Sequence, residues 1–182
     1  MLTKEVYETC KKRAAEYFDK AHIAITPEEM ERFQVAEYNL GMVEQIGLEL
    51  IEYVNTDRCC AKELVLFPGQ TCPEHRHPEI NGEPGKEETF RCRYGEVYLY
   101  VPGEGSKADI RAKLPAGKEE CFTVFHEIVL HPGEQYTLEP DTWHWFQAGK
   151  DGAVVSEFST RSRDEFDIYT DPAINPAEDR KI

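Results

Sequence analysis

The feature that most constrains the fold is a change of hydrophobic period near residue 48. From Leu48 to Ser159, apolar and polar residues alternate along short runs. The runs are LELIEYVN, KELVLF, ETFRCRYGEVYLYV, EIVLHPGEQYTL, WHWFQAG and AVVSEFST, and the turn signals between or within them include Pro68-Gly69, Asn81-Gly82, Pro102-Gly103, Pro132-Gly133 and Lys150-Asp151-Gly152. Many short strands at this spacing favour a double-sheet barrel or jelly roll, because such folds hide their strand edges.

The region before Leu48 has a helical period instead. Between residues 4 and 22, apolar residues recur at steps of three and four, which predicts one amphipathic helix. A second, short helix is predicted to start at Thr26, with Pro27 in its first turn and Glu29 closing a capping box. We therefore expect residues 1–182 to form a single domain: N-terminal helices over 1–45 packed on a barrel over 46–170, and a tail over 171–182 packed loosely on the surface.

Composition excludes several classes of partner. The net charge is −14 and the sequence pI is about 4.9, which argues against binding to nucleic acid or to an anionic membrane. The N-terminal stretch is charged throughout, without the apolar core of a secretory signal, and no apolar run is long enough to span a bilayer. We expect a cytoplasmic protein whose six cysteines, which form no C-x2-C pair, are free thiols.

Three histidines and one glutamate are the candidate metal ligands. His75 and His77 are separated by one residue, so on a strand both imidazoles would point to the same face. Glu88 opens a later strand, and His144 lies between two tryptophans. Each residue also has a structural interpretation, since a lone H-x-H can be a polar strand edge and His144 can pack in an aromatic cluster. Together, three imidazoles and one carboxylate suit a first-row divalent ion with positions left open for substrate.

The spacing of these residues favours the metal site over the structural interpretations. G-x5-H-x-H begins at Gly69 and E-x6-G begins at Glu88, and both intervals match the first motif of the cupin family. The second cupin motif is matched only loosely from Gly133 to His144: the histidine comes one residue early, a threonine replaces a glycine and the final asparagine is absent. Ten residues, PEINGEPGKE, separate H-x-H from Glu88, where cupins usually have three or four.

Three segments, from about Val54 to Asp171, resemble the bacterial D-lyxose isomerases, which are cupin-fold sugar isomerases. They are PEHRHPEINGEPGKEETFRCRYGEVYLYVPGE, HPGEQYTLEPDTWHWFQAG and SEFSTRSRDEFDIYTDP. The resemblance implies a manganese-dependent homodimer that interconverts free D-lyxose and D-xylulose and also D-mannose and D-fructose. It further implies that the ion is held by His75, His77, Glu88 and His144. The ligand types alone leave Co²⁺, Zn²⁺ and Fe²⁺ open as alternative ions.

Aldose–ketose isomerisation also needs a base near C2 of the sugar and positive charge beside the enediolate oxygens. Glu157 is the candidate base if it faces the barrel interior, although an outward-facing glutamate fits the sequence about as well without the resemblance. Lys86 ends the ten-residue insert and could donate to a substrate oxygen, or it could simply be solvated. Arg163 and Asp167 are weaker candidates for contacts with sugar hydroxyls, and both could equally belong to a surface ion pair.

Other functions fit the same ligand set. A cupin dioxygenase could hold iron or copper with three histidines and a glutamate, and a sugar-binding cupin could use the ion without turnover. A phosphosugar isomerase would need a cationic clamp, and no conspicuous cluster of lysine and arginine lies near the metal motifs.

Overall fold

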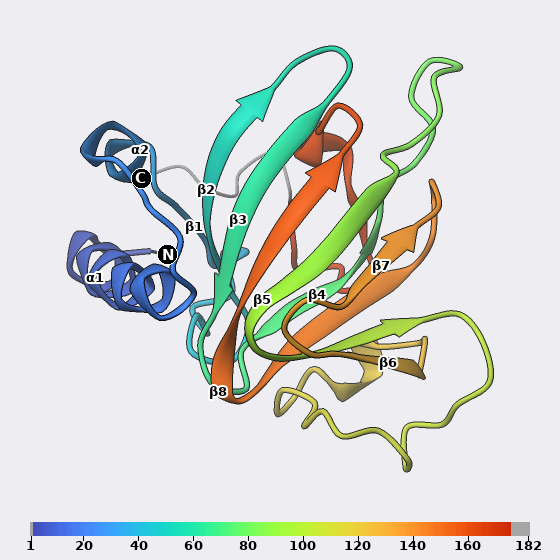
Figure 1. Ribbon diagram of the computed structural model, residues 1–182. Coiled ribbons are helices and arrows are strands. Elements are labelled where there is room, and N and C mark those ends of the chain that lie inside the picture. The colour runs from blue at the N-terminus through green and yellow to red at the C-terminus, as the bar shows by residue number, and fades with distance from the viewer. Residues whose placement is uncertain (1, 176–182) are drawn as a thin grey trace.

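The computed structural model describes residues 2–175, in which nine strands form one curled sheet (Figure 1). The strands are β1 Gln34–Ala36, β2 Leu48–Asn55, β3 Cys60–Leu66, β4 Thr71–Arg76, β5 Glu88–Val101, β6 His126–Leu130, β7 Gln135–Leu138, β8 His144–Ser159 and β9 Ile168–Tyr169. The helices are α1 Lys4–Lys20 and α2 Pro27–Glu31, with 3-10 turns at Glu119–Cys121 and Asp164–Phe166. This confirms the predicted cupin barrel, mainly β, with an N-terminal helical segment.

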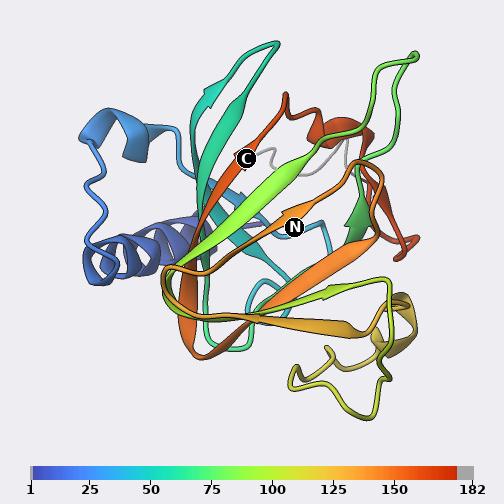
Figure 2. The same cartoon turned by 45° about the vertical axis from the view of Figure 1, so that its right-hand side comes forward.

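The two longest strands, β5 and β8, close the barrel. The first part of β8 pairs with β4 and its second part with β3, while β5 runs antiparallel beside both parts. Figures 1 and 2 show both strands curving so that the sheet folds back on itself. The bend needs glycine, because a Cβ on Gly95 would lie 1.9 Å from the carbonyl oxygen of Gly152, and both residues have positive φ.

The same bend corrects one prediction. Lys150-Asp151-Gly152 was expected to be a turn between two strands, but β8 continues through it and its register with β5 shifts there. The turn-forming residues serve a bulge, which sharpens the curvature of a continuous strand.

Three apolar clusters hold the barrel and its coverings together. One fills the barrel interior and includes Leu50, Leu64 and Phe146. A second joins α1 to the outer face of β2 and β3, where Phe18 packs with its neighbours. The third packs the long segment after β5 against the sheet. In this cluster Trp145 of β8 stacks on Tyr100 of β5 with a centroid distance of 3.9 Å. The interior cluster leaves one end of the barrel to polar residues, which line the site described below.

The N-terminal region departs from the prediction after its second helix. The capping box at Thr26 and Glu29 is confirmed, with both reciprocal hydrogen bonds present. The helical region ends at Glu31, however, rather than near residue 45, and the short strand β1 follows it. Tyr38 and Asn39 then adopt φ of 57° and 54°, a left-handed conformation that a continuing helix excludes.

The described part of the C-terminal tail is packed rather than loose. Asp171 is buried and its carboxylate lies 2.6 Å from Nζ of Lys118, while Ile174 belongs to the interior cluster. Residues 176–182 of the predicted tail lie outside the described residues. Contacts with Lys118 and the barrel interior therefore fix the chain as far as Ile174.

All six cysteines are free thiols, as predicted. The adjacent Cys59 and Cys60 differ in environment, because Cys59 is exposed and Cys60 is buried. Across residues 2–175, no helix has the length and apolar character required to cross a membrane.

Candidate metal centre and active site

Two neighbouring strands bring the predicted histidines together. His75 of β4 and His144 of β8 are direct cross-strand partners, and His77 follows β4 immediately. All three are buried, and one ring nitrogen from each lies within 4.8 Å of the others. The loose second cupin motif thus still places its histidine opposite the first motif, because the register of β4 and β8 positions it.

Each imidazole is held through its Nδ1 atom. The partners are the carbonyl oxygen of Pro73 at 2.8 Å for His75, the carbonyl oxygen of Thr142 at 2.9 Å for His144, and Oδ1 of Asp167 at 2.6 Å for His77. Carbonyl and carboxylate oxygens accept, so Nδ1 carries the proton in each ring and Nε2 is left as the ligand atom. Such contacts to the second nitrogen are the usual means by which proteins orient metal-binding histidines.

Glu88 completes the cluster. Its Oε1 lies 3.0 Å from Nε2 of His77 and 3.0 Å from Nε2 of His144. The Nε2 atom of His144 is nonetheless buried without a hydrogen-bond partner, an arrangement that is costly unless a ligand occupies it. Three clustered imidazole nitrogens, with a carboxylate oxygen beside two of them, therefore fit a divalent metal ion.

The protonation of two of these groups suits a cation. Burial, together with the neighbouring His144 and His77, holds the pKa of His75 well below its ordinary value. Burial alone would raise the pKa of Glu88, but Lys86 and His77 outweigh it and hold that pKa well below the usual range. His75 is therefore a neutral imidazole and Glu88 an ionised carboxylate, which are the forms that bind a metal. In His77, by contrast, burial and Lys86 would lower the pKa, but Glu88 and Asp167 outweigh them and raise the pKa to about 9, so metal binding at this ring displaces a proton.

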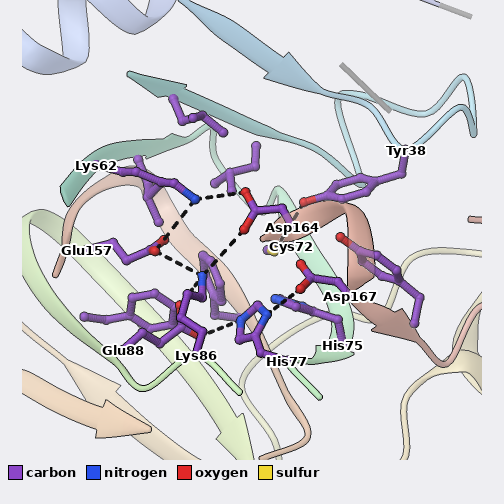
Figure 3. A pocket seen from close by; sticks show the side chains of 16 residues that line it. Tyr38, Lys62, Cys72, His75, His77, Lys86, Glu88, Glu157, Asp164 and Asp167 are labelled. Atoms are coloured by element: carbon purple, nitrogen blue, oxygen red, sulfur yellow. Dashed lines mark hydrogen bonds and ion pairs between the residues drawn. The ribbon is translucent and has the colours of Figure 1, made fainter. Parts of the chain in front are cut away.

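A buried cavity opens beside the cluster, and Figure 3 shows its lining. Leucines of β2 and β3 supply one wall, and charged side chains including Lys86, Glu88 and Glu157 supply another. Glu157 is 4% exposed and lines this cavity, so of the two orientations that the sequence allows it takes the inward one. Its Oε1 lies 3.1 Å from Nζ of Lys86.

Lys86 is buried rather than solvated because the ten-residue insert folds back onto the barrel. Asn81 and Gly82 both have positive φ and make a two-residue hairpin turn, closed by two 3.0 Å bonds between Ile80 and Glu83. The insert then passes so close to His77 that a Cβ on Gly85 would lie 1.9 Å from the His77 carbonyl oxygen. The close passage directs Lys86 into the cavity.

The environment of Lys86 keeps it charged. Burial would lower its pKa, but Glu157 and Glu88 outweigh burial and raise the pKa well above the ordinary value. Its Nζ lies 2.8 Å from Oε2 of Glu88. Lys86 is thus a fixed cation between the histidine cluster and Glu157.

Comparison with known proteins identifies the family. The model of the family described as D-lyxose isomerase matches residues 14–178. The chain belongs to this family. A D-lyxose/D-mannose isomerase of Thermosediminibacter oceani is 62% identical over 174 residues, which cover 96% of both chains. A D-lyxose ketol-isomerase of Cohnella laeviribosi is 62% identical over 162 residues, which cover 89% of this chain and 88% of the relative.

Solved structures of L-ribose isomerases have the same fold as this chain. An L-ribose isomerase of Cellulomonas parahominis superposes with a TM-score of 0.76 at 17% identity, covering 98% of this chain and 96% of the other. An L-ribose isomerase of Geodermatophilus obscurus gives 0.75 at 18% identity, with the same coverage. The barrel and its N-terminal helical segment are therefore a fold also found in these two L-ribose isomerases.

Asp167 and Arg163, the two weaker candidates for contacts with sugar hydroxyls, lie in different places. Asp167 is buried in the cavity wall, where it accepts the hydrogen bond from His77, and burial raises its pKa. Arg163 does not line this cavity: its guanidinium contacts Oε2 of Glu83 at 2.8 Å, and it lines a small recess beside His77 and Lys86. The structure thus places Asp167 behind the candidate ligand His77 and Arg163 in contact with the insert.

Several residues that line the cavity were not predicted from the sequence. Lys62 of β3 and Asp164 of the last 3-10 turn line the cavity, and the ring of Tyr169 stacks on His75 with a centroid distance of 5.4 Å. A signal for Lys62 was present, because it shares the inward period-two face of β3 with Leu64. Asp164 and Tyr169 lie in elements of three and two residues, which are too short to show a period.

Proposed function

We propose that this protein is a metal-dependent aldose–ketose isomerase that interconverts D-lyxose and D-xylulose and, as a second pair, D-mannose and D-fructose. Membership of the D-lyxose isomerase family supports the enzyme class, an intramolecular oxidoreductase acting on free sugars. The name of the Thermosediminibacter oceani relative supports the second sugar pair. The observation that carries the proposal is a carboxylate, Glu157, held 3.1 Å from Lys86 Nζ in the same buried cavity as the histidine cluster.

His75, His77, Glu88 and His144 would hold the ion, for which we propose Mn²⁺, with Co²⁺, Zn²⁺ or Fe²⁺ as alternatives. When bound, a divalent ion supplies positive charge beside O1 and O2 of the sugar and so stabilises the enediolate. The second contacts of the histidines fix the ligand nitrogens before the ion arrives, which lowers the cost of organising the site.

Glu157 and Lys86 would carry the proton chemistry. In the forward direction Glu157 removes the proton from C2 of the aldose and delivers it to C1, while the hydroxyl proton moves from O2 to O1. The C1 carbonyl becomes an alcohol and the C2 alcohol becomes a carbonyl, so no external oxidant or reductant is needed. The ammonium of Lys86 donates to the oxygen on which negative charge develops. Both side chains are buried, and the lower local dielectric strengthens both interactions.

The organisation of the protein is also proposed. We expect residues 1–182 to act as a single domain, which the packing of α1 on the barrel and of Ile174 in the interior cluster supports. A homodimer is expected on the family resemblance, and a cytoplasmic location on the sequence, with a free sugar as small-molecule partner and with no nucleic acid or membrane involved. The acidic composition is consistent with the last expectation.

The test is a metal-reconstitution assay. The protein is stripped with chelator, reloaded with each of the four ions, and supplied with D-lyxose or D-mannose. Ketose formation with at least one ion is expected, and no ketose from either sugar with any ion would overturn the proposal. Oxygen consumption would instead indicate a dioxygenase, sugar affinity without conversion would indicate a binding protein, and conversion of a phosphorylated aldose alone would indicate a phosphosugar isomerase.

A further inference from the structure

Four charged side chains in the cavity form a closed ring in which positive and negative groups alternate (Figure 3). We call Lys62, Glu157, Lys86 and Asp164 the charge ring. Going round it, the nitrogen–oxygen distances are 3.9 Å from Lys62 to Glu157, 3.1 Å from Glu157 to Lys86, 3.9 Å from Lys86 to Asp164 and 2.9 Å from Asp164 back to Lys62. We propose that Lys62 and Asp164 are positioning residues of the isomerase, which hold Glu157 and Lys86 in the geometry that proton transfer requires.

The backbone fixes half of the ring. Lys62 of β3 and Glu157 of β8 are direct cross-strand partners, so their side chains leave the sheet on the same inward face. On the other side of β8, Glu157 is opposite Phe90, which is apolar and offers no competing charge. Strand register therefore gives Glu157 one cationic neighbour, Lys62, and the insert gives it the second, Lys86.

Burial makes this pairing energetically significant. The side chains of Lys62, Lys86 and Glu157 are 3%, 6% and 6% exposed, and that of Asp164 is 17% exposed. A buried ammonium is tolerated only when it is paired, and the loss of one partner leaves an uncompensated charge. Within the ring each ammonium lies between two carboxylates and each carboxylate between two ammonium groups, and Lys86 also contacts Glu88, which lies outside the ring, at 2.8 Å.

Lys62 also secures the segment that crosses the cavity after β8. Its Nζ donates to Oγ of Ser162 at 2.8 Å, and that hydroxyl in turn donates to Asp164. Asn55 of β2 holds the backbone of Ser162 through two bonds of 3.1 Å. The same segment carries Asp167, which orients His77. Lys62 thus connects the proposed base with the segment that supports a proposed ligand.

The chemistry divides the ring into two halves. Glu157 and Lys86 are the groups that we assign to the sugar, whereas Lys62 and Asp164 act through them. This inference rests on the proposed function, since the ring positions nothing unless Glu157 transfers a proton. A misplacement of about 1 Å at a reacting group costs on the order of 100-fold in rate, so small losses of order in the ring become measurable.

The first test replaces Lys62 in the full-length, metal-loaded protein. For Lys62→Met we expect kcat for D-lyxose to fall about 10- to 100-fold, with KM and the metal content per chain changed less than about threefold. Lys62→Arg keeps the charge, and we expect it to restore kcat to within about threefold of the wild-type value. A rise in KM at unchanged kcat would show that Lys62 binds the sugar instead and would overturn the positioning role, as would an unchanged kcat.

The second test separates positioning from folding. Lys62→Met leaves the ring with excess negative charge, and Asp164→Asn leaves it with excess positive charge, so each single variant should unfold at a lower temperature than the wild type. The double variant is again balanced, and we expect it to be more stable than either single variant while its kcat stays as low as that of Lys62→Met. Recovery of kcat together with stability would show that Lys62 is merely structural and would overturn the proposal.

Lys118→Met is the matched control. Lys118 forms a comparable ion pair with Asp171 and secures the C-terminal segment, but it lies outside the cavity lining. We expect a lower unfolding temperature with kcat unchanged. The wild-type protein reports separately on the proposed function: if it forms no ketose the function fails, whereas if it is active and Lys62→Met is equally active only the positioning inference fails.

Discussion

Two regions of this barrel treat their buried acids in opposite ways. Inside the cavity, Glu88 and Glu157 lie within 3.1 Å of the ammonium of Lys86. Under α1, on the outer face of the sheet, Glu49 is equally inaccessible, but within residues 2–175 it forms no ion pair. Its Oε1 accepts a hydrogen bond from the Gln70 amide at 3.1 Å.

The pKa values of the two regions separate accordingly. Burial raises the pKa of Glu49 to about 8, although Gln70 and Arg13 partly oppose the effect. In the cavity, Lys86 and His77 overcome burial and hold the pKa of Glu88 well below the ordinary value. Cationic partners, rather than burial alone, decide whether a buried acid stays charged, and in the cavity Lys86 is such a partner for Glu88.

The largest effect is expected from removal of Lys86, the cation that the cavity acids share and that Glu49 lacks. Lys86→Met leaves Glu88, Glu157 and Asp164 without their common partner, so we expect the free energy of unfolding to fall by roughly 3–5 kcal/mol. We also expect kcat to fall by about 100-fold or more, because a group that stabilises the developing charge is lost. Steady-state kinetics and urea unfolding measure the two effects.

Lys150→Met is the control for that substitution, since Lys150 is an exposed lysine. We expect both its kcat and its stability to match those of the wild type. If Lys86→Met were as stable and active as Lys150→Met, the cavity acids would not depend on a cation, and the contrast with Glu49 would fail.

The next effect concerns Glu49 and the pH dependence of stability. Its folded-state pKa of about 8 lies above the ordinary value of 4.5, so between these pH values the folded protein binds more protons than the unfolded chain. The free energy of unfolding should therefore fall as pH rises from about 4.5 to 8, by about 1.4 kcal/mol for each pKa unit of difference.

Glu49→Gln should remove this dependence, because the amide does not ionise. We expect the variant to be more stable than the wild type at pH 8, by up to several kcal/mol, and close to it near pH 4.5. Urea unfolding at a series of pH values measures the difference. If the free energy of unfolding had the same pH dependence in the two proteins, the Glu49 carboxylate would already be stabilised in its charged form, as that of Glu88 is.

A smaller effect is expected behind the metal ligands. The Asp167 carboxylate orients the His77 ring and makes its Nε2 a more basic ligand atom. Asp167→Asn weakens this contact, so we expect metal affinity to fall about 10- to 100-fold. Titration of the stripped protein with Mn²⁺ measures it. Asp57→Asn alters an exposed acid that pairs with Arg161 at 2.9 Å, outside the cavity lining, and should leave metal affinity unchanged. Equal metal affinities for the two variants would show that Asp167 does not support metal binding through His77.

The sequence predicted those parts of the fold that repeat a local pattern. LELIEYVN coincides with β2 because its alternation is regular, and the capping box at Thr26 is a local motif with its own geometry. The two-residue strand β9 and the end of the helical region depend on tertiary contacts and on a left-handed backbone at Tyr38, neither of which has a clear local pattern. Turn-forming residues at 150–152 were ambiguous, because a bulge and a turn use the same ones.

The candidate site divides in the same way. The spacing of the cupin motifs predicted a histidine cluster, and the structure brings His75, His77 and His144 together. The inward orientation of Lys86 could not be deduced, since it depends on an insert that folds onto residues distant in sequence, and Lys86 and Glu157 are 71 positions apart. Lys62 was accessible to the period-two rule, but a lysine on an inward strand face becomes credible only when its partners are known.

The central claim is that this cavity catalyses ketol isomerisation with Glu157 as the base, and one measurement tests it most directly. D-Lyxose is supplied to the Mn²⁺-loaded wild type and to Glu157→Gln, and both ketose formation and bound metal are measured. We expect D-xylulose from the wild type and a loss of about 100-fold or more in kcat for the variant, with bound metal unchanged, because Glu157 lies outside the histidine cluster. Wild-type turnover in Glu157→Gln, or the absence of ketose with the metal-loaded wild type, would contradict the account.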